Sequence, residues 1–304
     1  SPHQAGLQAE KLLVQAKEEI NRTLDLAHQY EIIFTSGATE SNNMALKGIA
    51  YRKKETANEI ITSVLEHPSV LEVMRYLEEK QGFKLKYINV KEDGTIDIDD
   101  LKSLMSDKVG LVTCMYVNNV MGQIQPIQDI ADILKDYPRA HFHVDGVQAL
   151  GKIPMNFNGI DSLSLSGHKF NGLKGQGLLL IKNIQNIEPV IHGGGQEYGL
   201  RSGTVNLPMA ISMVKAIKQA VQGTEETNRK LKLFNQAIVT FLKDFKGVYI
   251  NSPENGAPHI INIGFPGVKG EVLVNAFSKH GVMVSTTSAC SSKRGKLNEV
   301  LLAT

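Results

Sequence analysis

The sequence has 304 residues, of which 42% are hydrophobic and 21% charged, and its formal net charge at pH 7 is +2. This length is enough for a large core and favours two domains, while the near-neutral charge gives no indication of direct nucleic-acid or membrane binding. With no apolar run near the ~20 residues of a membrane span, no visible signal peptide and two cysteines, we expect a cytoplasmic protein without a disulfide framework.

The first 222 residues predict alternating helices and strands. Apolar residues near helical spacing favour an amphipathic helix over residues 5–27. Strands are expected at residues 31–35, 59–64, 84–90, 110–117, 140–145, 161–165 and 176–182. Helices are expected from about residue 39 and at residues 68–80, 98–106, 126–136 and 208–222. This alternation favours an α/β fold with a mostly parallel sheet covered on both faces.

The pattern changes near residue 228. A long helix (228–245) precedes expected strands at 247–251 and 258–264, a helix at 269–279 and a strand at 281–286. We therefore predict a large domain over residues 15–225. An incomplete smaller α+β domain is expected over residues 226–304, joined by the first N-terminal residues.

Lys169 is the strongest candidate for covalent chemistry. It lies in Ser166-Gly167-His168-Lys169-Phe170, just after an expected strand. Such a lysine can hold pyridoxal 5'-phosphate (PLP) as a Schiff base, and an aspartate commonly pairs with the pyridine nitrogen. Asp145 ends a buried-looking strand and is the best candidate for that acid. The alternative is that Asp145 caps the next turn.

Ser36-Gly37-Ala38-Thr39-Glu40 joins an expected strand to a helix and is a candidate phosphate site. Free N–H groups at a helix N-terminus bind anions, and glycine allows close approach. Ser166 and His168 could bind the same phosphate from the lysine loop. The alternative for Thr39 is an ordinary helix cap.

His67 and Asn118 each follow an expected strand, where the active-site groups of open α/β sheets collect. The imidazole could stack on a pyridine ring and move protons. Asn118 could bond the phenolic oxygen of PLP or a substrate carboxylate. The alternatives are a loop histidine before a proline and a routine turn asparagine.

The two cysteines differ in setting. Cys114 lies inside an apolar strand and is expected to be inert core. Cys290 lies in a loop of mainly Ser, Thr, Gly and Lys, followed by Lys293, Arg294 and Lys296. Nearby cations favour a reactive thiolate. The alternative is a surface cysteine in a flexible linker. No histidine has metal-ligand spacing with either cysteine, so no metal site is expected.

The order and spacing of these segments resemble those of a known enzyme family. The chain resembles the cysteine desulfurases of the NifS/IscS type, within the class V aminotransferase-like PLP enzymes. The matching segments are Thr35-Ser36-Gly37-Ala38-Thr39-Glu40-Ser41-Asn42-Asn43, Glu66-His67, Val117-Asn118-Asn119, His143-Val144-Asp145-Gly146-Val147-Gln148, Ser166-Gly167-His168-Lys169, Arg201-Ser202-Gly203-Thr204 and Ser288-Ala289-Cys290-Ser291-Ser292. The resemblance implies the aspartate aminotransferase-like fold (fold type I), with a mostly parallel mixed sheet.

The resemblance also implies residue roles. Lys169 would hold PLP and move the substrate's α-proton, His67 would stack on the ring, and Cys290 would accept sulfur as L-cysteine becomes L-alanine. The implied cofactor-binding residues are Ala38, Thr39, His67, Asn118, Asp145, Gln148, Ser166, His168, Lys169 and Thr204. Because Thr204 would come from a second subunit, a homodimer is implied. The sulfur acceptor would be an iron–sulfur scaffold protein or a tRNA-thiolation enzyme.

The sequence departs from the family pattern in three places. An Asp-Asn-Ala-Ala-Thr-Thr-like run is absent, no arginine that could grip the substrate carboxylate follows Arg294, and Val120 replaces a common Glu. We therefore expect a chain truncated at both ends that holds PLP but binds cysteine poorly. The alternatives are a selenocysteine lyase or another class V PLP enzyme, and a catalytically impaired sulfur-transfer scaffold.

Overall fold

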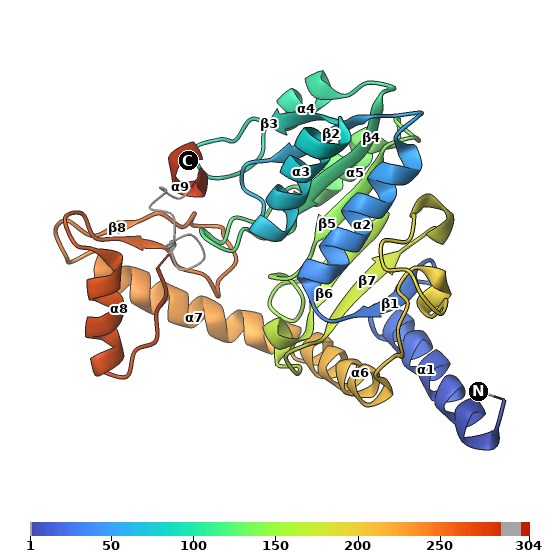
Figure 1. Cartoon of the computed structure of the whole chain (residues 1–304). Helices are drawn as coiled ribbons and strands as arrows, with labels where there is room; N and C mark the ends of the chain where they lie inside the picture. The colour runs from blue at the N-terminus through green and yellow to red at the C-terminus, as the bar shows by residue number, and fades with distance from the viewer. Residues whose placement is uncertain (1, 287–298) are drawn as a thin grey trace.

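A computed structural model describes residues 2–286 and 299–304. Its centre is a seven-stranded sheet in the order β1-β7-β6-β5-β4-β2-β3 (Figure 1). The strands are β1 (Glu31–Thr35), β2 (Glu59–Ser63), β3 (Lys84–Ile88), β4 (Val109–Met115), β5 (His141–Asp145), β6 (Ser162–Ser166) and β7 (Gly177–Ile181). β7 is antiparallel to both of its neighbours, and the other pairs are parallel. All strands except β7 therefore point the same way, and their carboxyl ends meet at one edge.

Helices cover both faces of this sheet. Figure 1 shows α2 (Ala38–Lys53) and α3 (Pro68–Gln81) over one face, where they bury one apolar cluster with the sheet. The other cluster takes in α1 (Gln4–Thr23), α4 (Ile98–Leu104), α5 (Ile127–Leu134) and α6 (Leu207–Gln222). α5 illustrates the cause, because Ile127, Ile130 and Leu134 recur at helical spacing and are all buried.

A second, smaller group of elements follows the sheet. α7 (Thr224–Leu242) leads from α6 to a two-stranded sheet of β8 (Tyr249–Ile250) and β9 (Ile263–Gly264), and α8 (Gly270–Lys279) follows (Figure 1). A short α9 (Glu299–Ala303) completes the described chain. Three 3-10 turns are η1 (Gly167–Phe170), η2 (Ile184–Asn186) and η3 (Glu197–Gly199). The exact division into two domains stays a prediction.

The structure departs clearly from the predicted elements in three places. Of the strand expected at 258–264, only Ile263–Gly264 forms as β9. The first helix ends at Thr23 and not at residue 27, because Asp25, Ala27 and His28 take positive φ angles in a tight turn. No strand forms over residues 281–286, where Val282, Met283 and Val284 are exposed and have no described strand to pair with. Apolar spacing alone could not show that these residues have no partner strand in the described part of the chain.

The alternation along β5 positions the polar groups of the site. Phe142 and Val144 point into the core shared with α5 and α6. His141, His143 and Asp145 occupy the opposite face, towards α2. Within the described residues, no helix is both long and apolar enough to cross a membrane.

Candidate active site

Most of the predicted site residues follow strands at the carboxyl edge of the sheet. His67 follows β2, Asn118 follows β4, Asp145 ends β5 and Lys169 lies in η1 after β6. The turn from β1 into α2 lies at the same edge, since Thr35 and Ser166 both pair with Gly177. This edge is where open α/β sheets bind ligands.

Asp145 is a buried acid with a defined orientation. Its residue is 5% exposed, its Oδ2 accepts a hydrogen bond from Asn42 Nδ2 (2.8 Å), and its Oδ1 accepts one from Val147 N (3.1 Å). Burial raises the pKa of this carboxyl, while the two hydrogen bonds and the interactions with His67 and Lys169 oppose the rise. A buried carboxylate so arranged fits a cationic partner, such as a protonated pyridine nitrogen.

Asn42 connects Asp145 to a row of buried polar groups. Asn42 Oδ1 lies 3.0 Å from His143 Nε2, and His143 Nδ1 lies 2.8 Å from Ser162 Oγ, which is also 2.8 Å from His141 Nε2. Burial lowers the pKa of His143 to about 3 and that of His141 well below its usual value. Both rings are therefore neutral at pH 7, and they orient Asn42 without adding charge.

Lys169 is held by its backbone in a tight loop. Gly167 N donates to Gln176 O (3.0 Å), Gly172 N donates to Gly167 O (2.8 Å), and Asn171 adopts a left-handed conformation (φ 64°). Lys152 Nζ donates to the carbonyl oxygen of Lys169 (2.6 Å). The Lys169 side chain is half-buried, and its charge affects the pKa of both His67 and Asp145. The three predicted groups are thus brought together.

His67 caps the N-terminus of α3 with its own ring. Its Nδ1 accepts a hydrogen bond from Ser69 N (3.1 Å) and lies 2.9 Å from Ser69 Oγ, which also accepts from Asn42 Nδ2 (2.9 Å). Burial lowers the pKa of this imidazole, and the charge of Lys169 lowers it further, against the effect of Asp145. The neutral ring therefore carries its proton on Nε2 and is fixed in orientation.

The turn before α2 has the form expected of an anion site. Gly37 is the N-cap of α2. The N–H groups of Ala38 and Thr39 lie in the first turn of the helix, so no carbonyl oxygen of the helix accepts a hydrogen bond from them. A Cβ built on Gly37 would meet no atom within 4 Å, so this side of the turn is open. Ser166 Oγ lies 3.0 Å from His168 Nδ1 in the lysine loop, and His168 is exposed.

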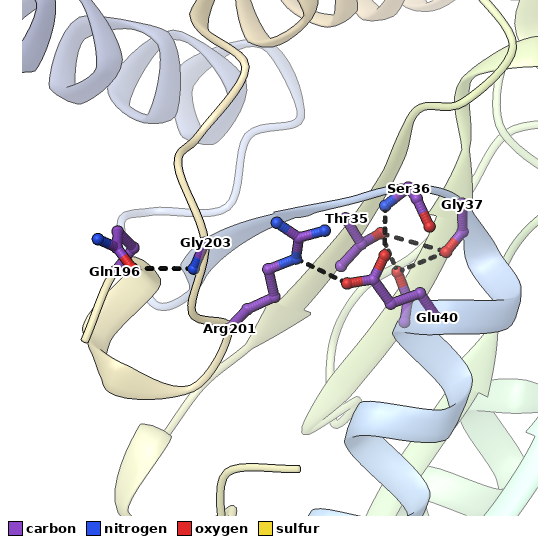
Figure 2. Close-up of polar contacts among 8 residues, drawn as sticks. Thr35, Ser36, Gly37, Glu40, Gln196, Arg201 and Gly203 are labelled. Atoms are coloured by element: carbon purple, nitrogen blue, oxygen red, sulfur yellow. Dashed lines mark hydrogen bonds and ion pairs between the residues drawn. The ribbon is translucent and has the colours of Figure 1, made fainter. Parts of the chain in front are cut away.

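Glu40 connects this turn to a second loop (Figure 2). Its Oε2 accepts a hydrogen bond from Ser36 N (2.7 Å), and its Oε1 accepts one from Arg201 Nε (2.7 Å). Hydrogen bonding to Arg201 and Ser36 outweighs burial and lowers the pKa of Glu40. The Glu40 carboxylate thus fixes Arg201 beside the N-terminus of α2.

The loop that carries Thr204 is ordered by further polar contacts. Gly203 N donates to Gln196 Oε1 (2.8 Å), as Figure 2 shows, and Lys17 Nζ forms an ion pair with Glu197 Oε2 (2.5 Å). Thr204 itself is exposed. This arrangement leaves the residue accessible to a second copy of the chain.

The remaining predicted residues are placed differently. Asn118 is 1% exposed, its Oδ1 accepts from Val120 N and Met121 N, and its Nδ2 donates to Leu65 O. Its amide therefore fixes the turn after β4, and its contact with a cofactor stays a prediction. Gln148 is half-buried in the turn after Asp145. Cys290 lies outside the described residues.

Two buried residues of the site had no role in the sequence interpretation. Asn42 is fully buried and holds Asp145, and Glu66 is 3% exposed and binds Met115 N. A possible signal for Asn42 was a polar side chain on the helix face that also carries Ala45, Leu46 and Ile49. Within the described ranges, no group of three or more His, Cys, Asp or Glu side chains is arranged to hold a metal ion.

Comparisons with known proteins identify the family of this chain. The aminotransferase class-V family matches residues 1–302. Cysteine desulfurase IscS of Dictyoglomus turgidum is 42% identical over all of this chain and 77% of its own length. The chain belongs to the cysteine desulfurases of the class-V family. Cysteine desulfurase IscS of Methanosarcina thermophila is 39% identical over 91% of this chain and 69% of its own length.

Solved structures of this family confirm the predicted fold. A structure described as a NifS-like protein has a TM-score of 0.91 and 37% identity, covering all of this chain and 80% of its own. A structure described as SspA in complex with cysteine has a TM-score of 0.83 and 32% identity, covering all of this chain and 85% of its own. The chain therefore has the α/β fold of PLP-dependent transferases, with a mostly parallel mixed sheet.

The residues present fit PLP. Asp145 offers a buried carboxylate to a cationic ring nitrogen, Lys169 offers an amine close to it, and the turn at Gly37 offers open N–H groups to a phosphate. His67 presents an imidazole fixed through Ser69. These four features are the ones that a pyridine ring with an aldehyde and a phosphate requires.

Proposed function

We propose that this chain is a PLP-dependent cysteine desulfurase that converts L-cysteine to L-alanine and takes the sulfur onto Cys290. The observation that carries the proposal is the meeting of Lys169, His67 and the buried Asp145 at the carboxyl edge of the sheet. The class-V match and the similarity to named cysteine desulfurases support the same reaction.

The bound PLP supplies an electron sink that weakens the bonds at the substrate's α-carbon. Lys169 anchors the cofactor and then moves the proton of that carbon, a role suited to an amine beside a carboxylate and a neutral imidazole. Asp145 holds the ring nitrogen, and Asn42 and Val147 hold Asp145. His67 covers the ring and excludes water from one side of it.

Cys290 acts as the nucleophile. Its thiolate attacks the sulfur of the substrate, so an S–S bond forms as the bond between Cβ and sulfur breaks. The electron pair of the broken bond stays with the carbon fragment, which takes up protons and leaves as alanine. Lys293, Arg294 and Lys296 follow Cys290 closely in sequence and favour its thiolate form.

We infer that the enzyme is a cytoplasmic homodimer. The exposed Thr204, on a loop fixed through Arg201 and Glu40, supports a contribution to the phosphate site of a partner subunit. The sulfur of the Cys290 persulfide would pass to an acceptor protein, either an iron–sulfur scaffold or a tRNA-thiolation enzyme. The solved relative described as in complex with cysteine supports the substrate class.

The anchor can be tested by reducing the PLP-loaded protein with borohydride and mapping the modified peptide. We expect PLP to be fixed to Lys169 in the wild type and to be lost on dialysis of Lys169→Ala. Lys174→Ala is a matched control, because Lys174 lies exposed in the same loop. A lasting covalent link in Lys169→Ala, or a link to another lysine in the wild type, would contradict the proposal.

A further inference from the structure

Glu66 is a buried acid for which the proposed reaction has no use. It lies between the end of β2 and α3, is 3% exposed, and accepts one hydrogen bond, from Met115 N to its Oε1 (2.6 Å). Its Oε2 is buried and has no hydrogen-bond partner in the described part of the chain. A carboxylate in such a place would be poorly solvated, so the neutral acid is the favoured form.

Glu66 and Asp145 lie on opposite sides of β4. The pairing of β2 with β4 ends at Ile61 and Val112. Beyond that point, Met115 N of β4 donates to the Glu66 side chain and not to the backbone of β2. Met115 is the register partner of Asp145 on β5. One strand, β4, therefore separates the two carboxyls, which are both buried at the same edge of the sheet and close enough for the charge of Asp145 to act on Glu66.

The two acids differ in how well each can carry a charge. Asp145 has two hydrogen-bond donors and the positive charge of Lys169 nearby, whereas Glu66 has one donor. Cys114, the other titratable group that interacts with Glu66, is a buried thiol whose pKa is raised well above its usual value. Two like charges in a shared buried site disfavour each other, so a single negative charge is the stable total.

We propose that Glu66 is a positioning residue for the cofactor ring, which holds the proton of a carboxyl pair and so keeps the pair's single negative charge on Asp145. This inference rests on the proposed function for the identity of the ring that Asp145 receives. Burial, reinforced by the charge of Asp145, raises the pKa of Glu66 to about 8. At pH 7, below this pKa, Glu66 is neutral in the free protein and does not compete with Asp145 for the negative charge of the pair.

The proton can be followed by infrared spectroscopy of the protein without PLP. We expect the carbonyl band of a protonated carboxyl at pH 7 in the wild type, fading as pH rises through about 8, and its loss in Glu66→Gln. Glu66→Gln keeps an oxygen acceptor for Met115 N. Glu59→Gln is the matched control, since Glu59 is also buried but is ion-paired with Lys86, which lowers its pKa.

The link to Asp145 and to the ring requires two further titrations. We expect the pH at which half of the Glu66 band is lost to fall by one unit or more in Asp145→Asn. It should also fall in the PLP-loaded wild type. Both changes remove the repulsion from an unpaired negative charge. A midpoint that is unchanged in both would contradict the pair, even if Glu66 is protonated.

Unfolding gives a second readout, which needs no cofactor. A carboxyl whose pKa is higher in the folded state stabilises the fold below its unfolded pKa, and this stability is lost as pH rises through the folded pKa. The folding equilibrium constant of the wild type relative to Glu66→Gln should therefore fall about tenfold per pH unit between about 4.5 and 8. The proposal would be overturned if the ratio of the two folding equilibrium constants did not change with pH and the wild type and Glu66→Gln had the same carboxyl band at pH 7. Glu66 would then be ionised. If PLP binds elsewhere than at Lys169 while Glu66 titrates as stated, the function fails and the carboxyl pair stands.

Discussion

At the scale of single residues, the site depends on how Asp145 is held. Asn42 occupies one carboxylate oxygen, and its own amide oxygen lies against the neutral His143. The arrangement places a charge-stabilising amide against the acid, and the charge of Lys169 acts on it as well. A reaction that depends on the charge of Asp145 therefore also depends on Asn42.

We predict that Asn42→Ala weakens PLP binding by about 10- to 100-fold, because a hydrogen bond to a charged group contributes about 1.5–3 kcal/mol. The pKa of Asp145 should rise as well, since Asn42 opposes the effect of burial. Fluorescence titration with PLP measures the affinity. Asn43→Ala is the control, because within the described residues the Asn43 amide donates to its own helix, at Thr39 O, and not to Asp145. Equal affinities for the two variants would contradict this role.

The sequence singled out the residues that we propose to act directly, and it gave no role to the residues that hold them in place. Lys169, Asp145 and His67 follow strands in recognisable segments, so their meeting at one edge could be predicted from the α/β pattern. Asn42 lies 103 residues from Asp145, and Glu66 depends on where β2 and β4 separate. Contacts of this kind arise from packing of the folded chain, which local sequence does not encode.

At the scale of elements, the phosphate turn depends on close packing against β7. A Cβ on Gly177 would lie 2.5 Å from both the carbonyl carbon and Cα of Gly37, and 2.5 Å from Thr35 Oγ1. The turn can approach β7 this closely only because residue 177 has no side chain. This contact fixes the start of α2 relative to the lysine loop, which begins where β6 pairs with Gly177.

Gly177→Ala should destabilise the fold by about 1–3 kcal/mol, because backbone atoms must move to admit the methyl group. It should also weaken PLP binding more than the loss of stability alone would explain, since the shifted turn is the proposed phosphate site. Urea unfolding and PLP titration measure the two effects. Gly264→Ala is a matched strand control, as its nearest neighbour would lie at an ordinary 3.5 Å. Similar losses in both variants would show that the close approach is unimportant.

The errors in the predicted elements have a common cause. The apolar pattern of the first helix continues through residues 24–27. Leu24 and Leu26 are indeed buried, but they lie in a turn that contains residues in the left-handed conformation. Residues 281–286 have the composition of a strand but no described partner strand. In both places a local pattern was correct about which side chains are apolar and wrong about the backbone that carries them.

At the scale of the whole molecule, stability depends on the protonation of buried groups. His143 is neutral in the folded protein because burial lowers its pKa to about 3. Its folded pKa lies below its unfolded value of about 6.5, so its contribution to stability is present above pH 6.5 and is lost as pH falls towards 3.

The variant His143→Gln isolates this effect, because glutamine can donate and accept hydrogen bonds without titrating. At pH 7 we expect the wild type to be the more stable protein. The difference in the free energy of unfolding should shrink by about 1.4 kcal/mol per pH unit as pH falls below about 6.5. Urea unfolding from pH 7 to pH 5 measures it, and a difference that stays constant over this range would show that His143 is not kept neutral by the fold.

The most direct test of the account is the mass of the peptide that contains Cys290 after PLP-loaded protein is mixed with L-cysteine. We expect one added sulfur atom on Cys290 and a matching amount of alanine, with Cys114 unmodified as an internal control because it is buried. Lys169→Ala should produce neither the added sulfur nor alanine. Alanine formed in the wild type without sulfur on Cys290, or sulfur on Cys290 in Lys169→Ala, would contradict the central claim that Lys169 and Cys290 act in one reaction.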